Sequence, residues 1–146
     1  MPTLIQYLRW LKALPRRIRD DVAAYHLPLE WWAKGVTIEP AVTIHMGEHA
    51  QLEIGRRTSI MAYTILILGD DPNAESPVPS ILKIGERTTI GRFNNIRAGG
   101  GEIVIGSHCL TSQFVSILAS NHSIARNARI RDQPWDTTRN KTHIGD

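Results

Sequence analysis

The sequence of 146 residues predicts an all-β solenoid built from six-residue units and preceded by a helical segment. Random order would give about one or two Ile-Gly pairs in this composition, but the sequence has five, at 54–55, 84–85, 90–91, 105–106 and 144–145. Aliphatic residues also recur every six positions, as in Ile54, Ile60 and Leu66. A compact residue follows four positions after each leading aliphatic one: Val42, Thr58, Thr64, Thr88, Asn94, Cys109 and Val115. A period of six does not fit a helix, whose faces repeat at 3.6 residues.

Each six-residue unit is interpreted as one short strand and a turn. The aliphatic side chain points inward, the glycine permits the turn backbone, and the compact residue fits the crowded interior. Three units make one triangular coil of about 18 residues, and stacked coils pair their strands in parallel. Cys109 occupies a compact position and is therefore expected to be inert core. Thr111 interrupts the aliphatic series between Ile105 and Ile117.

The N-terminal segment, residues 1–35, lacks the six-residue pattern of the solenoid predicted for residues 36–146. Its apolar residues fall at helical spacing and predict a helix over 3–25, interrupted at Pro15. We interpret it as a cap that covers the apolar end of the solenoid. The alternative is a basic amphipathic anchor that makes peripheral contact with a membrane. Trp31 and Trp32 are expected to pack at the junction.

Three insertions interrupt the repeat. Residues 69–80, GDDPNAESPVPS, predict an external loop, and three glycines at 99–101 lengthen a later unit. Residues 120–143 contain no hexad and predict a long polar excursion, and loops longer than about 12–15 residues are usually functional or disordered. The repeat resumes at Ile144, two residues before the chain ends at Asp146, so we expect a C-terminally truncated solenoid.

Composition limits the classes of partner and compartment. The net charge is +3, and basic side chains concentrate in residues 1–26 and 126–141. Zinc-finger spacing and an RNP-like aromatic signature are absent from the sequence, so nucleic acid is not an expected partner. The single cysteine excludes a disulfide framework within one chain. With no apolar run of roughly 18 residues and no secretory signal, a cytoplasmic protein is expected.

The hexads IGRRTS, IGERTT, IGRFNN and IGSHCL resemble those of the hexapeptide-repeat acyltransferases over roughly residues 36–146. The resemblance implies a left-handed parallel β-helix, against the general rule of right-handed crossovers. The segment LASNHSIARNARIRDQPWD, residues 118–136, resembles the part of the sugar and xenobiotic O-acetyltransferases that carries the catalytic histidine. The matching residue is His122.

This resemblance implies transfer of acetyl from acetyl-CoA to a hydroxyl of a sugar or surface polysaccharide. His122 would act as general base, since a neutral imidazole can take the hydroxyl proton. The resemblance also implies a homotrimer with its active site between neighbouring subunits. Asn94 is expected either to contact the acceptor or to fill the compact hexad position. Asn121 directly precedes His122 and is expected to lie in the substrate site. Trp135 and Arg126 are expected to line the acceptor pocket, where the arginine would bind an anionic group.

Two other classes of function remain open. If the early end removes the coils that build the donor groove, the chain would be a non-catalytic, inactive oligomeric scaffold. A zinc-dependent lyase of the same fold would use His45, His49 or His108. Zinc sites need three or four well-placed ligands, and the spacing of His45 and His49 on a strand does not bring their rings together, so no metal is expected.

Overall fold

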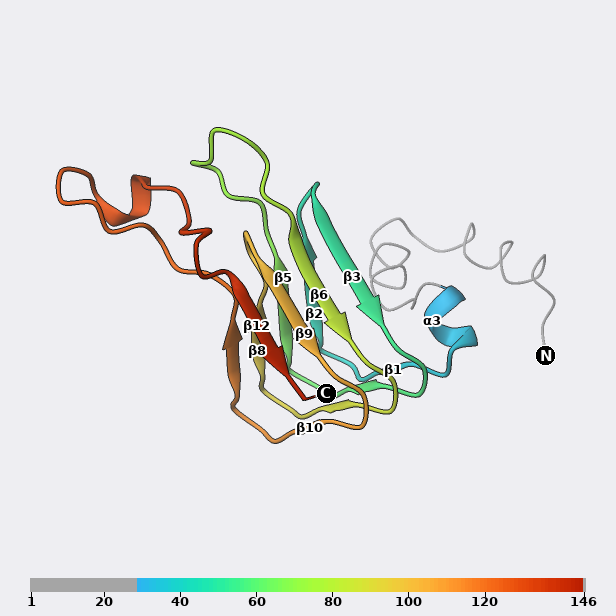
Figure 1. Ribbon diagram of the computed structural model, residues 1–146. Coiled ribbons are helices and arrows are strands. Elements are labelled where there is room, and N and C mark those ends of the chain that lie inside the picture. The colour runs from blue at the N-terminus through green and yellow to red at the C-terminus, as the bar shows by residue number, and fades with distance from the viewer. Residues whose placement is uncertain (1–28, 146) are drawn as a thin grey trace, which may run out of the picture.

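The computed structural model describes residues 29–145 and forms a parallel β-helix (Figure 1). The predicted helix over 3–25 lies outside the described residues. The strands are short: β1 (Thr37–Ile38), β2 (Thr43–Met46), β3 (Ala50–Ile54), β4 (Ser59–Ile60), β5 (Ile65–Leu68), β6 (Ser80–Ile84), β7 (Thr89–Ile90), β8 (Asn95–Arg97), β9 (Glu102–Ile105), β10 (Leu110–Thr111), β11 (Ser116–Leu118) and β12 (Lys141–Ile144).

Each coil contributes one strand to each of three parallel sheets. The strand orders are β1-β4-β7-β10, β2-β5-β8-β11 and β3-β6-β9-β12. The register aligns the leading aliphatic positions of successive coils, which form three inward columns: Ile38, Ile60, Ile90 and Thr111; Ile44, Leu66, Ile96 and Ile117; and Ile54, Ile84, Ile105 and Ile144. Their side chains form or border the buried core. The hexad interpretation of the sequence is therefore confirmed.

Three of the hexad glycines are needed for a different reason from the one the sequence indicated, whereas Gly145 has the positive φ of a turn glycine, 86°. Gly55, Gly85 and Gly91 do not have positive φ angles. A Cβ on Gly55 would instead overlap the backbone nitrogen of Glu86 in the next coil, and one on Gly85 would overlap that of Ser107. The glycine therefore permits close approach between coils.

The left-handed backbone conformation falls two residues later in the unit, on residues with side chains. Two columns of such residues run along two corners of the solenoid. One consists of Arg57, Arg87 and His108, with φ between 53° and 59°. The other contains Tyr63, Phe93 and Phe114, whose rings stack with centroids 5.0 and 5.1 Å apart. Stacking compensates in part for the unfavourable backbone, since an aromatic pair contributes about 0.5–1.5 kcal/mol beyond its area burial.

Buried threonines join the coils at the compact position. Thr58, Thr64 and Thr88 are fully buried, and each hydroxyl donates to a glycine carbonyl of the next coil at 2.7–2.8 Å. Each also accepts a backbone N–H from that coil, as Thr58 does from Thr88 at 3.2 Å. The compact position therefore supplies a hydrogen bond between coils as well as a small volume, which explains why threonine recurs there.

The short helix α3 (Leu29–Ala33) precedes the first coil. Trp31 packs against the core as expected, whereas Trp32 is 67% exposed. The side chain of Lys34 contacts Glu30 at 2.6 Å, one helical turn away. Within residues 29–145 no helix is long and apolar enough to cross a membrane.

The two long insertions leave the same corner of the solenoid, between the second sheet and the third (Figure 1). The first insertion connects β5 to β6. The sequence predicted a loop over residues 69–80, and the structure agrees except at Ser80, which is the first residue of β6. The second connects β11 to β12 and contains the 3₁₀ turn Ile130–Asp132. It ends at Asn140 rather than at residue 143, because residues 141–143 already pair with β9.

Candidate functional site

A pocket of about 260 Å³ lies where the second insertion meets the outer face of the sheet β2-β5-β8-β11. Its floor comes from neighbouring positions on three strands, Ile67, Arg97 and Leu118. The other lining residues are Gly99, Ser120, Asn121, His122 and Trp135. The rigid coils therefore provide one side of the pocket and the insertion provides the other.

The insertion approaches the pocket as a narrow two-stranded stem. His122 and Trp135 pair as an isolated antiparallel bridge. The amide of Ser123 donates to the carbonyl of Pro134 at 2.9 Å, and that of Asp136 donates to Asn121 at 2.7 Å. The rings of His122 and Trp135 meet edge to face, with centroids 6.4 Å apart and planes at 80°. Backbone pairing therefore positions the His122 backbone beside that of Trp135, and the imidazole lies against the indole ring.

Gln133 organises the distal part of the insertion. Its side chain is 4% exposed although it lies in a loop. Its Oε1 accepts from the amide of Ala125 at 2.7 Å, and its Nε2 donates to the carbonyls of Ala125 and Ala128 at 3.1 and 2.9 Å. A buried amide with three partners holds the segment after His122 in a defined fold.

The two insertions are bound to each other. Asp71, in the loop between β5 and β6, accepts the backbone amide of Trp135 on its Oδ2 at 2.6 Å. Asn73 donates from Nδ2 to the carbonyl of Arg131 at 3.0 Å and to that of Gln133 at 3.3 Å. Sequence reasoning treated these loops separately and missed both residues.

The three inserted glycines create room for Trp135 and for the returning chain. A Cβ on Gly99 would lie 2.8 Å from the indole ring of Trp135, and one on Gly100 would lie 2.5 Å from it. Gly100 also has a φ of +63°. A Cβ on Gly101 would overlap the carbonyl of Asn140. Only glycine allows the indole to pack directly on this backbone.

The contact between His122 and Gln133 favours one tautomer of the imidazole. Its Nδ1 lies 3.3 Å from the carbonyl oxygen of Gln133. A carbonyl oxygen can only accept, so this contact is a hydrogen bond only when Nδ1 carries the proton. Nε2 then holds the free lone pair, and it has no hydrogen-bond partner among the described residues. An exposed imidazole in this state can accept a proton from a bound hydroxyl.

Asp136 stabilises the turn that follows Trp135. Its Oδ1 accepts from the hydroxyl of Thr138 at 2.7 Å and from the amide of Thr138 at 2.9 Å. These two hydrogen bonds, the hydroxyl first, hold the pKa of Asp136 below its usual value. The carboxylate therefore remains ionised at neutral pH.

Asn94 does not line the pocket. Its side chain is 1% exposed; Nδ2 donates to the hydroxyl of Thr111 at 2.7 Å and Oδ1 accepts the amide of Val115 at 2.8 Å. Both ends of the amide are used inside the coil. The position therefore favours the second alternative, a residue that fills the compact hexad site, and it does not support the expected contact with an acceptor.

Arg126 is also absent from the pocket lining. Its side chain is exposed in the distal part of the insertion and makes no hydrogen bond or ion pair with the described residues. The cation that lines the pocket is Arg97, whose Nε donates to Asn95 Oδ1 at 3.0 Å. Arg97 directly follows the inward Ile96, so its outward position was readable from the hexad. Because Arg97 is far from the insertion along the chain, the sequence did not indicate that it lines the same pocket as His122.

Of the residues singled out from the sequence, the structure thus brings together His122, Asn121 and Trp135. Within residues 29–145 no group of three histidine, cysteine, aspartate or glutamate side chains is arranged to hold a metal ion. Comparison of the chain with protein-family models, with curated proteins and with solved structures found no match.

Proposed function

We propose that the chain is an O-acetyltransferase of the hexapeptide-repeat type, with a left-handed coil, which transfers acetyl from acetyl-CoA to a hydroxyl of a sugar or polysaccharide. The observation that carries the proposal is the placement of His122 on a pocket wall, with Nδ1 against the Gln133 carbonyl and Nε2 free. The repeat pattern and the parallel coils support the choice of family.

In the proposed reaction, Nε2 of His122 removes the proton of the acceptor hydroxyl as its oxygen attacks the thioester carbonyl carbon. The new C–O bond forms, the C–S bond breaks, and the leaving thiolate takes the proton back from the imidazolium. The Gln133 carbonyl stabilises the imidazolium through Nδ1–H. General-base catalysis of this kind contributes a factor of about 10²–10⁴ in rate.

The pocket lining supports an acceptor with both an apolar and an anionic part. Trp135, Ile67 and Leu118 supply apolar surface, and Arg97 supplies a guanidinium. A guanidinium forms paired hydrogen bonds with a carboxylate or phosphate. An acidic sugar carrying a free hydroxyl combines these features, and we propose it as the acceptor class.

The donor requires more space than this pocket offers. Drug-sized ligands occupy pockets of roughly 300–1,000 Å³, whereas this pocket has about 260 Å³. We therefore place only the acceptor and the reacting thioester here, and the rest of acetyl-CoA in a groove shared with a neighbouring subunit of a homotrimer. A closed cyclic trimer would provide three such grooves.

The test is a calorimetric titration of the 146-residue chain with acetyl-CoA, followed by a thiol-release assay over a panel of neutral and acidic sugars. Saturable binding and acceptor-dependent release of CoA support the proposal. Failure to bind acetyl-CoA would favour a non-catalytic scaffold. Light scattering on the same sample tests the trimer, which a stable monomer would contradict.

A further inference from the structure

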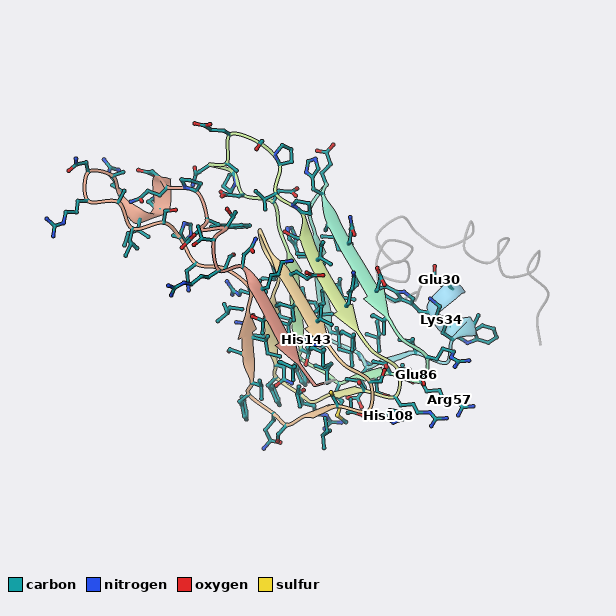
Figure 2. The ribbon with its side chains drawn as sticks, viewed as in Figure 1. Glu30, Lys34, Arg57, Glu86, His108 and His143 are labelled. Atoms are coloured by element: carbon teal, nitrogen blue, oxygen red, sulfur yellow. The ribbon has the colours of Figure 1, made fainter. Side chains whose placement is uncertain are left out.

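A second site lies at the corner between the third sheet and the first, on a different corner from His122. Figure 2 shows Lys34, Arg57, Glu86 and His108 gathered there. A cavity of about 350 Å³ at this corner is lined by Lys34, Arg56, Arg57, Arg87, Glu86 and the loop at Ala33–Gly35. Its charged lining is thus four cations and one carboxylate. We call these residues the basic corner.

The repeat itself gathers the cations. Arg57 and Arg87 occupy the left-handed turn position in successive coils, with φ of 56° and 53°. Backbone hydrogen bonds lock this stacking: Arg57 donates to the carbonyl of Lys34 at 3.0 Å, and Arg87 to that of Arg56 at 2.8 Å. Equivalent residues of paired strands lie about 4.8 Å apart, so the backbone holds these two arginines side by side.

The acidic side chains at this corner are already engaged. Glu86 pairs with Arg56 at 3.2 Å, and Glu30 pairs with Lys34 at 2.6 Å. Arg57 and Arg87 form no ion pair with any residue in the 29–145 part of the chain, and both are exposed. Two like charges in adjacent turns repel each other unless an anion lies between them.

We propose that the basic corner binds a phosphate-bearing ligand, with the guanidinium groups of Arg57 and Arg87 on the phosphate oxygens. Guanidinium groups match the geometry of phosphate and form two parallel hydrogen bonds with it. The cavity is large enough for a diphosphate and its neighbouring group. The same chemistry serves a soluble phosphorylated compound and a phospholipid headgroup.

The variant that tests this site is Arg57→Asn combined with Arg87→Asn. Asparagine is among the residues that best tolerate the left-handed region, so the substitution removes both charges without opposing the backbone. The matched control is Arg92→Gln, which also removes an exposed arginine from a turn of the solenoid but lies outside the cavity. Thermal melts of both variants verify that the coils are intact.

The experiment titrates pyrophosphate into the full chain at low salt, by calorimetry and by amide chemical-shift mapping. The expected result is saturable binding, with shifts concentrated at 34–35, 56–57 and 86–87, weakened at least tenfold in the double variant and less than twofold in Arg92→Gln. Co-sedimentation with vesicles of phosphatidic acid, compared with phosphatidylcholine, forms the second arm.

Binding to pyrophosphate alone assigns the site to a soluble phosphorylated ligand, and binding to phosphatidic acid vesicles assigns it to a headgroup. Either result supports the proposal only if the double variant loses the binding. Failure of both probes to bind, or equal losses in the double variant and in Arg92→Gln, would overturn it. The outcome is independent of acetyl transfer, because none of these residues lines the pocket of His122.

Discussion

The backbone amide of Trp135 donates to Oδ2 of Asp71 at 2.6 Å, and this bond joins two insertions that lie far apart along the chain. Asp71 belongs to the loop between β5 and β6, whereas Trp135 pairs with His122 in the stem between β11 and β12. The position of the candidate base therefore depends on a carboxylate contributed by a different coil.

Replacing Asp71 with alanine should loosen the stem that carries His122. A hydrogen bond to a charged group contributes about 1.5–3 kcal/mol, so the amide of Trp135 should exchange with solvent about tenfold faster or more. The measurement is hydrogen exchange followed by NMR. The control Asp132→Asn changes a carboxylate of the second insertion, whose ion pairs within residues 29–145 are with Arg129 and Arg131. Equal exchange rates in Asp71→Ala and wild type would show that the hydrogen bond from Trp135 to Asp71 does not hold the stem.

Gly99→Ala should displace Trp135 from its packing site. The new methyl would lie 2.8 Å from the ring, and overpacking of this kind costs about 1–3 kcal/mol. We expect a shift of the indole N–H resonance of Trp135 and a loss of ligand binding in the pocket. The matched control is Gly69→Ala, because the nearest atom to its Cβ is Ile67 Cγ2 at 3.9 Å. An unmoved indole resonance in Gly99→Ala would show that the contact is not tight.

Asn94 and Thr111 should be energetically coupled. Thr111→Val removes the hydroxyl that accepts from Asn94 Nδ2 at 2.7 Å and leaves a buried donor unpaired, which costs about 1–3 kcal/mol. Adding Asn94→Thr places a threonine at the compact position, as in Thr58 and Thr88, whose hydroxyls bond to the backbone of the next coil. The double variant should therefore recover most of the stability that Thr111→Val loses. Urea unfolding of the two single variants and the double variant measures the coupling. Strictly additive losses would contradict it.

Asp70 should contribute to stability above its pKa and lose that contribution in acid. Its carboxylate accepts the amides of Glu48 and His49 at 2.6 and 3.1 Å, and these bonds, that of Glu48 first, lower the pKa of Asp70. The folded state therefore favours the ionised form of Asp70. The contribution of this carboxylate to stability is complete above the pKa of an unfolded aspartate, about 4, and it is lost as the pH falls from there through the lower pKa of the folded state. The difference in Tm between wild type and Asp70→Asn should be largest at neutral pH and should shrink below about pH 4. A difference that stays constant down to pH 2 would contradict the assignment.

The core was predictable because the period of six is a direct consequence of the coil. Ile60, Leu66 and Ile96 must all point inward if each unit is one strand and one turn, and all three are fully buried. The role of the hexad glycines was not predictable in the same way. The close approach of Gly55 to Glu86 is a contact between coils, and a local pattern cannot distinguish it from a turn requirement.

The candidate site was only partly predictable. The motif at residues 118–136 identified His122, Asn121 and Trp135. Asn121 adjoins His122 in the sequence, and Trp135 pairs with His122 across the stem. Asp71 has no local signal, and the hexad indicates only that Arg97 faces outward, since the roles of both residues arise only when coils stack and loops meet. Asn94 fits both alternatives at the sequence level, and only its hydrogen bonds to Thr111 and Val115 distinguish a coil residue from a binding residue.

The measurement that tests the central claim most directly is the rate of acetyl transfer in His122→Ala, with an acceptor that supports turnover in the wild type. The matched control is His45→Ala, which removes an exposed histidine from β2, in the sheet that forms the floor of the pocket, without changing a residue that lines the pocket. The proposal predicts a fall in kcat of about 10²–10⁴ for His122→Ala, with acetyl-CoA binding retained, and no comparable fall for His45→Ala. A wild-type rate in His122→Ala would contradict the assignment of this histidine as the general base.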